Sequence, residues 1–88
     1  MFTIIADSHT YRLQAERLAD ALREDGADVY LDEGYANTVL SRIYSASTKW
    51  VIHVRDRTTV AVRNKYDGTV SSNMKSSAFL SNWQSYCD

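Results

Sequence analysis

Residues 50–63 read WVIHVRDRTTVAVR, and this stretch decides what kind of sheet the chain can form. Residues 50–54 are rich in β-branched and aromatic side chains, which is typical of a buried strand. Residues 58–63 resume the same character directly after the polar sequence Arg55-Asp56-Arg57. So short a connection cannot hold the helical crossover that two parallel strands need. The stretch therefore predicts an antiparallel hairpin whose first strand, residues 50–54, is the central strand of the sheet.

The segment before the hairpin predicts one α/β unit. Residues 11–34 read YRLQAERLADALREDGADVYLDEG. Charged side chains ring most of a helix there, and apolar ones recur at helical spacing along one face, namely Tyr11, Ala15, Leu18, Ala19 and Leu22. Gly26 ends this helix, because a residue without a Cβ adopts the left-handed conformation at low cost. Residues 27–31 then predict a second strand, which a turn at residues 32–34 closes.

Two further elements are expected in the first half of the chain. Residues 2–6 form a short apolar run, which predicts a first strand buried on both faces. Residues 7–10 supply several side chains that can cap the helix that follows. Residues 35–47 predict a second helix, because they place apolar side chains at helical spacing, namely Val39, Leu40, Ile43 and Ala46.

The chain after the hairpin predicts an edge strand and a terminal helix. Residues 64–68 carry a turn signal, and residues 69–71 add a short edge strand. Ser76 or Ser77 is expected to cap the terminal helix. Its apolar face docks on the sheet through Phe79, Leu80 and Trp83, with Tyr86 or Cys87 beyond them.

These elements predict an α/β fold with a small mixed β-sheet in the order β-α-β-α-β-β-(β)-α. A chain of 88 residues has no material for a second core, since a domain of this size buries only about 60–65% of its unfolded surface. One domain spanning residues 1–88 is therefore expected. Right-handed crossovers place the first strand in the middle, or beside the second and third strands.

Composition narrows the class of protein. Hydrophobic residues make up 44% of the chain and charged residues 24%, which is typical of globular proteins and argues against disorder. The single cysteine, Cys87, excludes an internal disulfide and a thiol-based metal site, and favours a cytoplasmic location. Residues 1–7 have no basic leader, and their apolar run is too short for a membrane span. No membrane association is expected.

Charge is distributed unevenly along the chain. Residues 1–44 contain eight acidic residues and four arginines, whereas residues 45–88 contain six basic and three acidic residues, so the halves carry −4 and +3. A surface for a polyanion must therefore come from the second half. A solvated surface of mixed charge is the alternative interpretation.

No catalytic constellation can be written from the sequence. The three glycines fit neither the GxGxxG pattern nor the P-loop. His9 and His53 form no triad by spacing, and His53 is expected to be a packed residue of the central strand. We therefore expect no catalytic residue, no cofactor and no metal, and a protein that is not an enzyme. The enzyme alternative places Asp7 and Ser8, with His9, at the carboxyl end of the first strand, where anions and small ligands often bind.

The hairpin carries a basic and aromatic composition. Four cations flank its strands, interleaved with Trp50, His53 and Tyr66, and they are Arg55, Arg57, Arg63 and Lys65. Such a mixture is typical of sheet edges that contact single-stranded RNA. The alternative interpretation is that these arginines keep an exposed edge strand from pairing with other chains.

Six segments together carry a family resemblance. They read AERLADALREDG at residues 15–26, VYLD at 29–32, VLSRI at 39–43, TKWVIHV at 48–54 and TVAVR at 59–63, followed by the terminal helix at 79–86. This succession resembles the anticodon-binding domain at the carboxyl end of class II aminoacyl-tRNA synthetases for histidine, threonine, proline and glycine. The resemblance implies the class II anticodon-binding fold, without a catalytic synthetase core.

The resemblance also implies a non-catalytic role in binding RNA or tRNA. We expect the domain to dock on RNA or on a protein that handles nucleic acid. The expected polyanion contacts are Arg55, Arg57, Arg63 and Lys65, and the expected specificity surface beside them is Tyr35, Asn37 and Arg42.

A weaker resemblance is to a truncated TIR domain. It is carried by the pairs Ser8-His9, Leu18-Ala19, Leu22-Arg23, Val29-Tyr30 and Asp32-Glu33, by Gly26, and by the serines of residues 45–47. Such a domain continues with further parallel strands and a helix that bears a glutamate. This chain has no glutamate after Glu33, so NAD cleavage is not expected.

The acidic first half supports an alternative function. The chain would then be a small protein-binding inhibitor or adaptor, for example one encoded by a phage. The expected contacts with a basic partner are Asp20, Glu24, Asp25, Asp28, Asp32 and Glu33. The sequence leaves the partner and the oligomeric state open.

Overall fold

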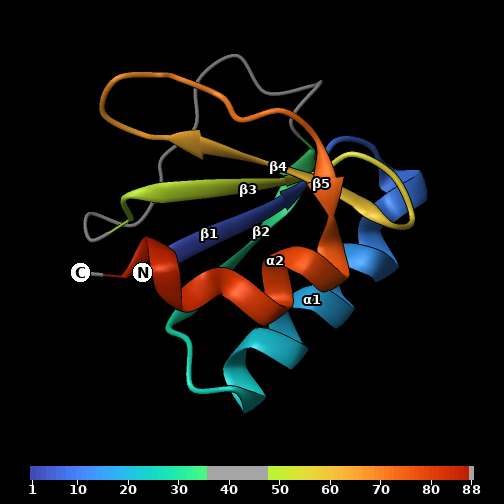
Figure 1. The fold of residues 1–88 in the computed structure, drawn as a ribbon. Helices are drawn as coiled ribbons and strands as arrows, with labels where there is room; N and C mark the ends of the chain where they lie inside the picture. The colour runs from blue at the N-terminus through green and yellow to red at the C-terminus, as the bar shows by residue number, and fades with distance from the viewer. Residues whose placement is uncertain (36–47, 88) are drawn as a thin grey trace.

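A five-stranded mixed sheet forms the centre of the computed structural model, which describes residues 1–35 and 48–87 (Figure 1). Its strands lie in the order β2-β1-β3-β4-β5. Their bounds are β1 Phe2–Ala6, β2 Val29–Tyr35, β3 Trp50–Val54, β4 Thr59–Asn64 and β5 Met74–Lys75. The first three strands are mutually parallel, and β4 runs antiparallel to both β3 and β5. The small mixed α/β fold predicted from the sequence is therefore confirmed.

The predicted hairpin is present and occupies the middle of the sheet. β3 pairs along its whole length with β1 on one side and with β4 on the other, from Trp50 opposite Asn64 to Val54 opposite Val60. β1 lies between β2 and β3, which agrees with the placement predicted for the first strand. Residues 50–54 thus form the predicted central strand.

Helix α1 (Arg12–Glu24) follows a short 3₁₀ turn, η1 (His9–Tyr11). It buries the predicted apolar stripe against the sheet, with Tyr11 partly buried beside it. Gly26 has a φ of +95°, its N–H donates to the carbonyl of Arg23 at 3.0 Å, and the N–H of Ala27 donates to the carbonyl of Leu22 at 2.9 Å. These two bonds are the Schellman pattern, so Gly26 ends the helix as predicted.

Helix α2 (Ser76–Asn82) and the 3₁₀ turn η2 (Trp83–Tyr86) lie with α1 on one face of the sheet (Figure 1). The main core is between these helices and the sheet, where the ring of Phe79 stands edge-on to Phe2 at 5.8 Å. The predicted docking of the terminal helix is confirmed. Within the described ranges, no helix is long and apolar enough to cross a membrane.

The opposite face of the sheet is also buried. Thr3 and Ile5 of β1 and Val51 of β3 have almost no exposed surface, which confirms that β1 is buried on both faces. The hydroxyls of Thr3 and Thr48 lie 2.7 Å apart and form a buried hydrogen bond. This face carries more polar side chains than the helix-covered face, and His53 and Asp32 are among them.

The turn predicted at residues 32–34 is wrong, because these residues belong to β2. The register between β1 and β2 changes there, from Ile4 opposite Leu31 to Ala6 opposite Tyr35. Oδ1 of Asp32 accepts a hydrogen bond from the N–H of Gly34 at 2.9 Å. The side chain thus satisfies the local backbone within an irregular strand, and the chain does not reverse.

The edge strand predicted at residues 69–71 is also wrong. Only Val70 makes an isolated bridge, to Arg63, and β5 forms further on, at Met74–Lys75. Polar side chains occupy the backbone groups that a longer ladder would need. Asp67 accepts a hydrogen bond from the N–H of Thr69 at 2.8 Å, and the hydroxyl oxygen of Ser71 accepts one from the N–H of Val62 at 3.0 Å.

The predicted helix caps are wrong as well. The residues at the cap positions of α1 and α2 are Tyr11 and Lys75, and neither makes a side-chain cap hydrogen bond. Backbone carbonyls satisfy the N–H groups instead, since Tyr11 donates to Ser8 at 3.1 Å and Ser76 donates to Thr58 at 2.8 Å. Tyr35 ends β2, and the rest of the helix predicted at residues 35–47 lies outside the described residues.

Candidate nucleic-acid interface

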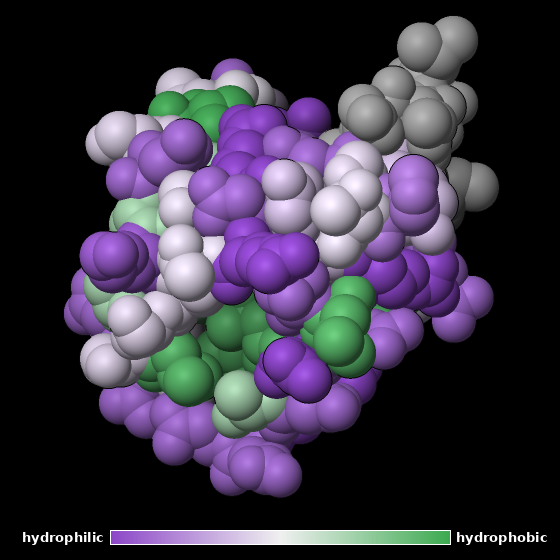
Figure 2. Space-filling model, turned by 90° about the vertical axis from the view of Figure 1, so that its right-hand side faces the viewer, coloured by the Kyte–Doolittle hydropathy of each residue, from purple (hydrophilic) through white to green (hydrophobic). Residues whose placement is uncertain are grey.

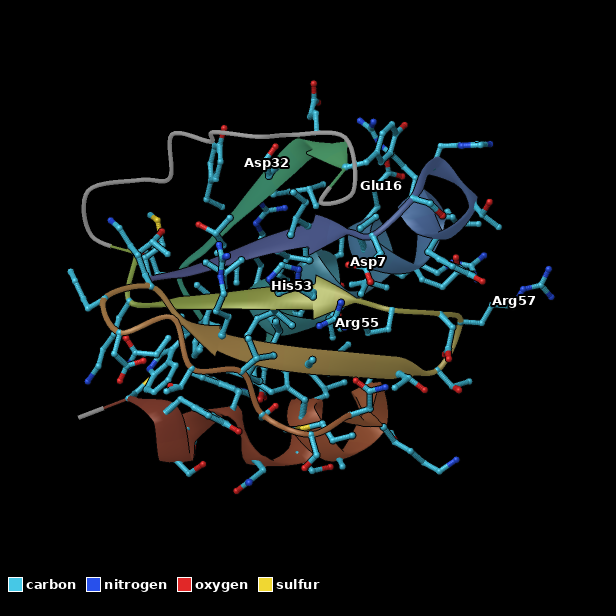
Figure 3. The ribbon with its side chains drawn as sticks, turned by 90° about the horizontal axis from the view of Figure 1, so that it is seen from above. Asp7, Glu16, Asp32, His53, Arg55 and Arg57 are labelled. Carbon is cyan, nitrogen blue, oxygen red and sulfur yellow. The ribbon has the colours of Figure 1, made fainter. Side chains whose placement is uncertain are left out.

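Three charged or titratable side chains meet where the parallel strands β1 and β3 end (Figure 3). Nη1 of Arg55 donates a 3.0 Å hydrogen bond to Oδ2 of Asp7, and Nδ1 of His53 lies 3.5 Å from Oδ1 of the same carboxylate. The order of the strands reverses between β1 and β3, which is the position where open α/β sheets commonly bind ligands. The cluster therefore lies where the enzyme alternative would need it.

The electrostatics of this cluster limit what it can do. His53 is 8% exposed, and burial lowers its pKa below the ordinary value of 6.5. The positive charges of Arg63 and Arg55 lower this pKa further, while Asp7 raises it. His53 is thus neutral at pH 7, beside an ion pair between Asp7 and Arg55. The guanidinium of Arg55 is already engaged by a carboxylate and is a weak candidate for a phosphate contact.

The other two residues of the enzyme alternative, Ser8 and His9, make their contacts outside this cluster. The backbone carbonyl of Ser8 accepts the N–H of Tyr11, and the exposed ring of His9 packs edge-on to Tyr35 at 6.2 Å. Asp7 is the one residue of this set that contacts His53 within the described part of the chain. Tyr35 in turn accepts a 3.4 Å hydrogen bond from Nη1 of Arg12 through its hydroxyl.

A second basic group lies at the open end of the hairpin. The N–H of Lys65 donates to the carbonyl of Lys49 at 2.9 Å, which joins the chain after β4 to the chain before β3. Nζ of Lys65 lies 5.6 Å from the ring centre of Tyr66, and Nζ of Lys49 lies 5.3 Å from that of Trp50. We call Lys49, Arg63, Lys65, Trp50 and Tyr66 the basic end of the hairpin.

The four predicted polyanion contacts are therefore spread along the hairpin, and Arg63 lies close enough to His53 to lower its pKa. Arg55 and Arg57 lie at the closed end of the hairpin, whereas Arg63 and Lys65 lie at its basic end. About 20 Å of strand separates Arg57 from Arg63, at roughly 3.3 Å per residue. Tyr35 is at the end of β2, and the other two predicted specificity residues, Asn37 and Arg42, lie outside the described residues.

Lys49 was not among the residues that sequence reasoning selected. Its signal was the hairpin register, because the pairing of Trp50 with Asn64 places residues 49 and 65 opposite each other. Reading that register from the turn would have grouped Lys49 with Lys65. The short turn alone did not fix the register. The sequence therefore grouped basic residues that are close along the chain, and Lys49 was left out.

The six acidic residues of the alternative function are also divided. Asp20, Glu24, Asp25 and Asp28 are exposed at or after the carboxyl-terminal part of α1. Asp25 accepts a 2.6 Å hydrogen bond from the indole N–H of Trp83, and Asp20 lies 3.6 Å from Arg23. Asp32 is 5% exposed, so it is removed from this surface, and Glu33 lies on β2.

The described residues offer no metal site, and the sequence shows no family relationship. Across residues 1–35 and 48–87, no three His, Cys, Asp or Glu side chains converge on a position that could hold a metal ion. Cys87 is exposed and forms no disulfide. The sequence matches no known protein family, and no curated protein is significantly similar to it.

Proposed function

We propose that this chain is a non-catalytic binding domain whose basic end contacts single-stranded RNA. The observation that carries the proposal is the pair Lys65 and Tyr66, in which a lysine ammonium lies beside an aromatic ring that is 70% exposed. An exposed ring can stack on a base of any sequence, which contributes about 1–3 kcal/mol per base. The adjacent lysine can neutralise the phosphate of the stacked nucleotide.

The number of basic residues favours the basic end over the closed end of the hairpin. The basic end brings together Lys49, Arg63 and Lys65, and the nearby Asp67 is engaged by the N–H and the hydroxyl of Thr69. At the closed end, Arg55 is paired with Asp7. An RNA strand that approaches the basic end therefore meets three basic residues near the exposed ring of Tyr66. The ring of Trp50 is partly buried, because it packs on Tyr86 and its indole N–H donates to the carbonyl of Tyr86 at 3.0 Å.

Similarity to the class II anticodon-binding fold is part of the proposal. Its support is the succession of elements, in which two strands flank a helix and are followed by an antiparallel hairpin and a terminal helix. The non-catalytic part of the proposal is supported by the Asp7 cluster. Its carboxylate is held by Arg55 and its imidazole is only 8% exposed, so the first group is engaged and the second is almost inaccessible to a ligand.

Binding of a fluorescein-labelled 12-nucleotide oligouridine, followed by anisotropy across salt concentrations, tests the proposal. Contacts by three cations give a slope of about −2 in log affinity against log salt, or about a 20-fold loss between 50 and 200 mM. Lys65→Gln should reduce the slope by about 0.7, and Tyr66→Ala should weaken binding about 10-fold at every salt concentration. Tyr66 is exposed and Lys65 is only partly buried, so both variants should remain folded.

Arg57→Gln is the matched control, because it removes a cation from the closed end. It should change neither the affinity for oligouridine nor the slope. Affinity that does not respond to salt, or an equal loss in the Arg57→Gln and Lys65→Gln variants, would contradict an RNA interface at the basic end.

A protein-binding inhibitor or adaptor is the second candidate function. The observation that favours it is the exposed group Asp20, Glu24, Asp25 and Asp28 at one end of the molecule. Capture of interacting molecules before and after nuclease treatment separates the two candidates. A nuclease-resistant protein partner that is lost when Glu24 and Asp28 become amides favours this function, whereas a nuclease-sensitive interaction favours RNA.

A further inference from the structure

An apolar hollow of about 260 Å³ lies between α1, α2 and the closed end of the hairpin. Figure 2 shows it as a recessed hydrophobic area bordered by hydrophilic side chains. Its apolar lining comes from three parts of the chain, and consists of Leu18, Ala21, Val54, Val60 and Leu80. Apolar surface hollowed and bordered in this way is typical of binding sites for other molecules.

One end of the hollow is positively charged. Arg17 of α1 and Arg57 of the β3–β4 turn line it, and neither forms an ion pair with any residue that the structure describes. Asp56 is also present, but its carboxylate accepts the N–H of Thr58 at 2.9 Å. This bond and those to Thr59 lower the pKa of Asp56, so its carboxylate is ionised and the three side chains together carry a net charge of +1.

The wall of the hollow also contains a buried hydrogen-bond acceptor without a donor among the described residues. Oε1 of Gln14 is buried and has no hydrogen-bond partner among the described residues. An unsatisfied buried acceptor costs about 1–3 kcal/mol. The hollow therefore combines two cations with a buried acceptor, Oε1 of Gln14, that no described residue satisfies.

The hollow continues along α1 to a negatively charged end. Ala21 and Leu80 also line a neighbouring depression, together with Glu24 and Asp25. Residues 14, 17, 18, 21, 24 and 25 follow one another at helical spacing, so they form a single stripe on α1. Arg17 and Glu24 are about 10 Å apart along the helix axis, at 1.5 Å per residue. The stripe is basic at one end, apolar in the middle and acidic at the other.

The size and the charges of this groove select one kind of occupant. A hollow of about 260 Å³ is smaller than the roughly 300–1,000 Å³ that drug-sized ligands occupy, so it fits one or two side chains of a longer molecule. An amphipathic helix presents such side chains to a groove at intervals of three or four residues. Helices also tend to carry acids in the first turn and bases in the last, which matches the polarity of the groove in one orientation.

We propose that the groove between α1 and α2 binds an amphipathic helix of a partner protein. Carboxylates in the first turn of that helix lie against Arg17 and Arg57. One or two leucine or aromatic side chains fill the hollow, and a lysine or arginine about two turns later lies against Glu24. This site is separate from the basic end of the hairpin, so it is independent of RNA binding.

A pair of synthetic helical peptides tests the proposal with the full chain. The first is a fluorescein-labelled, lactam-stapled 16-residue helix with two glutamates in its first turn, leucines on one central face and two lysines in its last turn. The second exchanges the glutamates and lysines, which preserves composition and net charge. Anisotropy titrations should give at least 10-fold tighter binding for the first peptide. Equal affinities for the two peptides would overturn the proposal.

Two variants locate the binding in the groove. The double variant Arg17→Glu with Arg57→Glu changes only exposed side chains, so it should fold normally. It should lose at least 10-fold in affinity for the first peptide and bind the exchanged peptide no more weakly than before. Ala21→Met keeps the helix propensity of α1, places extra volume in the hollow and should weaken both peptides. Unchanged affinities in both variants would overturn the proposal.

Lys65→Glu is the matched control, since it changes a partly buried cation that does not line the groove and should leave peptide binding unchanged. The Arg17→Glu, Arg57→Glu variant should in turn keep its affinity for oligouridine, so a failure here is distinguishable from a failure of the RNA proposal. Sedimentation of the chain alone tests the competing occupant. A dimer that this double variant dissociates would overturn the partner helix in favour of a second copy.

Discussion

Nδ1 of His53 lies 3.5 Å from Oδ1 of Asp7, in a part of the sheet where neither atom has a hydrogen-bond partner among the described residues. The other carboxylate oxygen of Asp7 accepts the 3.0 Å bond from Arg55. The carboxylate thus forms a hydrogen bond with Arg55 but not with His53. Burial consequently determines the protonation of His53 more than its acidic neighbour does.

The stability of the fold should depend on pH through His53. Its pKa in the folded chain is below the ordinary 6.5, so the unfolded chain binds the proton more tightly. This contribution to the free energy of unfolding is complete above pH 6.5 and is lost as the pH falls from 6.5 through the folded pKa. Urea unfolding between pH 5 and 8 should show the loss in the wild type and a smaller loss in His53→Gln. His9→Gln, at an exposed position, should behave as the wild type.

Substitutions beside His53 should move its pKa in opposite directions. Asp7→Asn removes the one neighbour that raises this pKa, so the pKa should fall further. Arg55→Gln removes a positive charge that lowers it, so the pKa should rise. NMR titration of the His53 imidazole measures both shifts. If the pKa of His53 moved in the same direction in both variants, a change in its burial and not the removed charge would be the cause.

The buried hydroxyl pair of Thr3 and Thr48 should behave as a coupled unit. Thr3→Val keeps the shape of the side chain but leaves the Thr48 hydroxyl without its 2.7 Å partner. Each single valine variant should lose about 1–2 kcal/mol of unfolding free energy, because a buried polar group is left unsatisfied. The double variant should lose less than the sum of the two. Chemical denaturation of all four proteins completes the cycle, and additive losses would argue against the coupling.

Gly26→Ala should destabilise the fold by about 1–2 kcal/mol, because its φ of +95° is unfavourable for a residue with a Cβ. No atom lies within 4 Å of the position that the Cβ would take, so the cost comes from the backbone and not from a collision. Gly26→Asn is the matched control and should retain most of the stability, since asparagine tolerates this conformation. Thermal unfolding monitored by circular dichroism compares the three proteins.

The parts of the fold that sequence predicted were those set by local pattern. The short turn after Val54 left antiparallel pairing as the one arrangement for two apolar strands, and the spacing of Leu18 and Leu22 defined the buried face of α1. Gly26 ended that helix because no other residue type adopts its conformation as cheaply.

The incorrect predictions concern places where side-chain hydrogen bonds or contacts between distant segments outweigh the local sequence pattern. Asp32 and Gly34 are turn residues by composition, but the Asp32 carboxylate bonds to the backbone within β2. Pairing between Asp7 and Arg55 joins residues 48 positions apart, so sequence could not show that Arg55 is engaged. The groove was missed for the same reason, because Arg17 and Arg57 flank one hollow only after the hairpin has packed beside α1.

The two edge strands of the sheet affect how this protein behaves at high concentration. β5 has only two residues and one of them is Lys75, while β2 changes register at residues 32–34. A strand from another molecule would find few consecutive backbone groups to pair with on either side, and on one side it would meet a charge. Among the described residues, growth of fibrils by addition of strands to these edges is therefore obstructed in the folded state, so this route to aggregation requires that one of the edges first unfold.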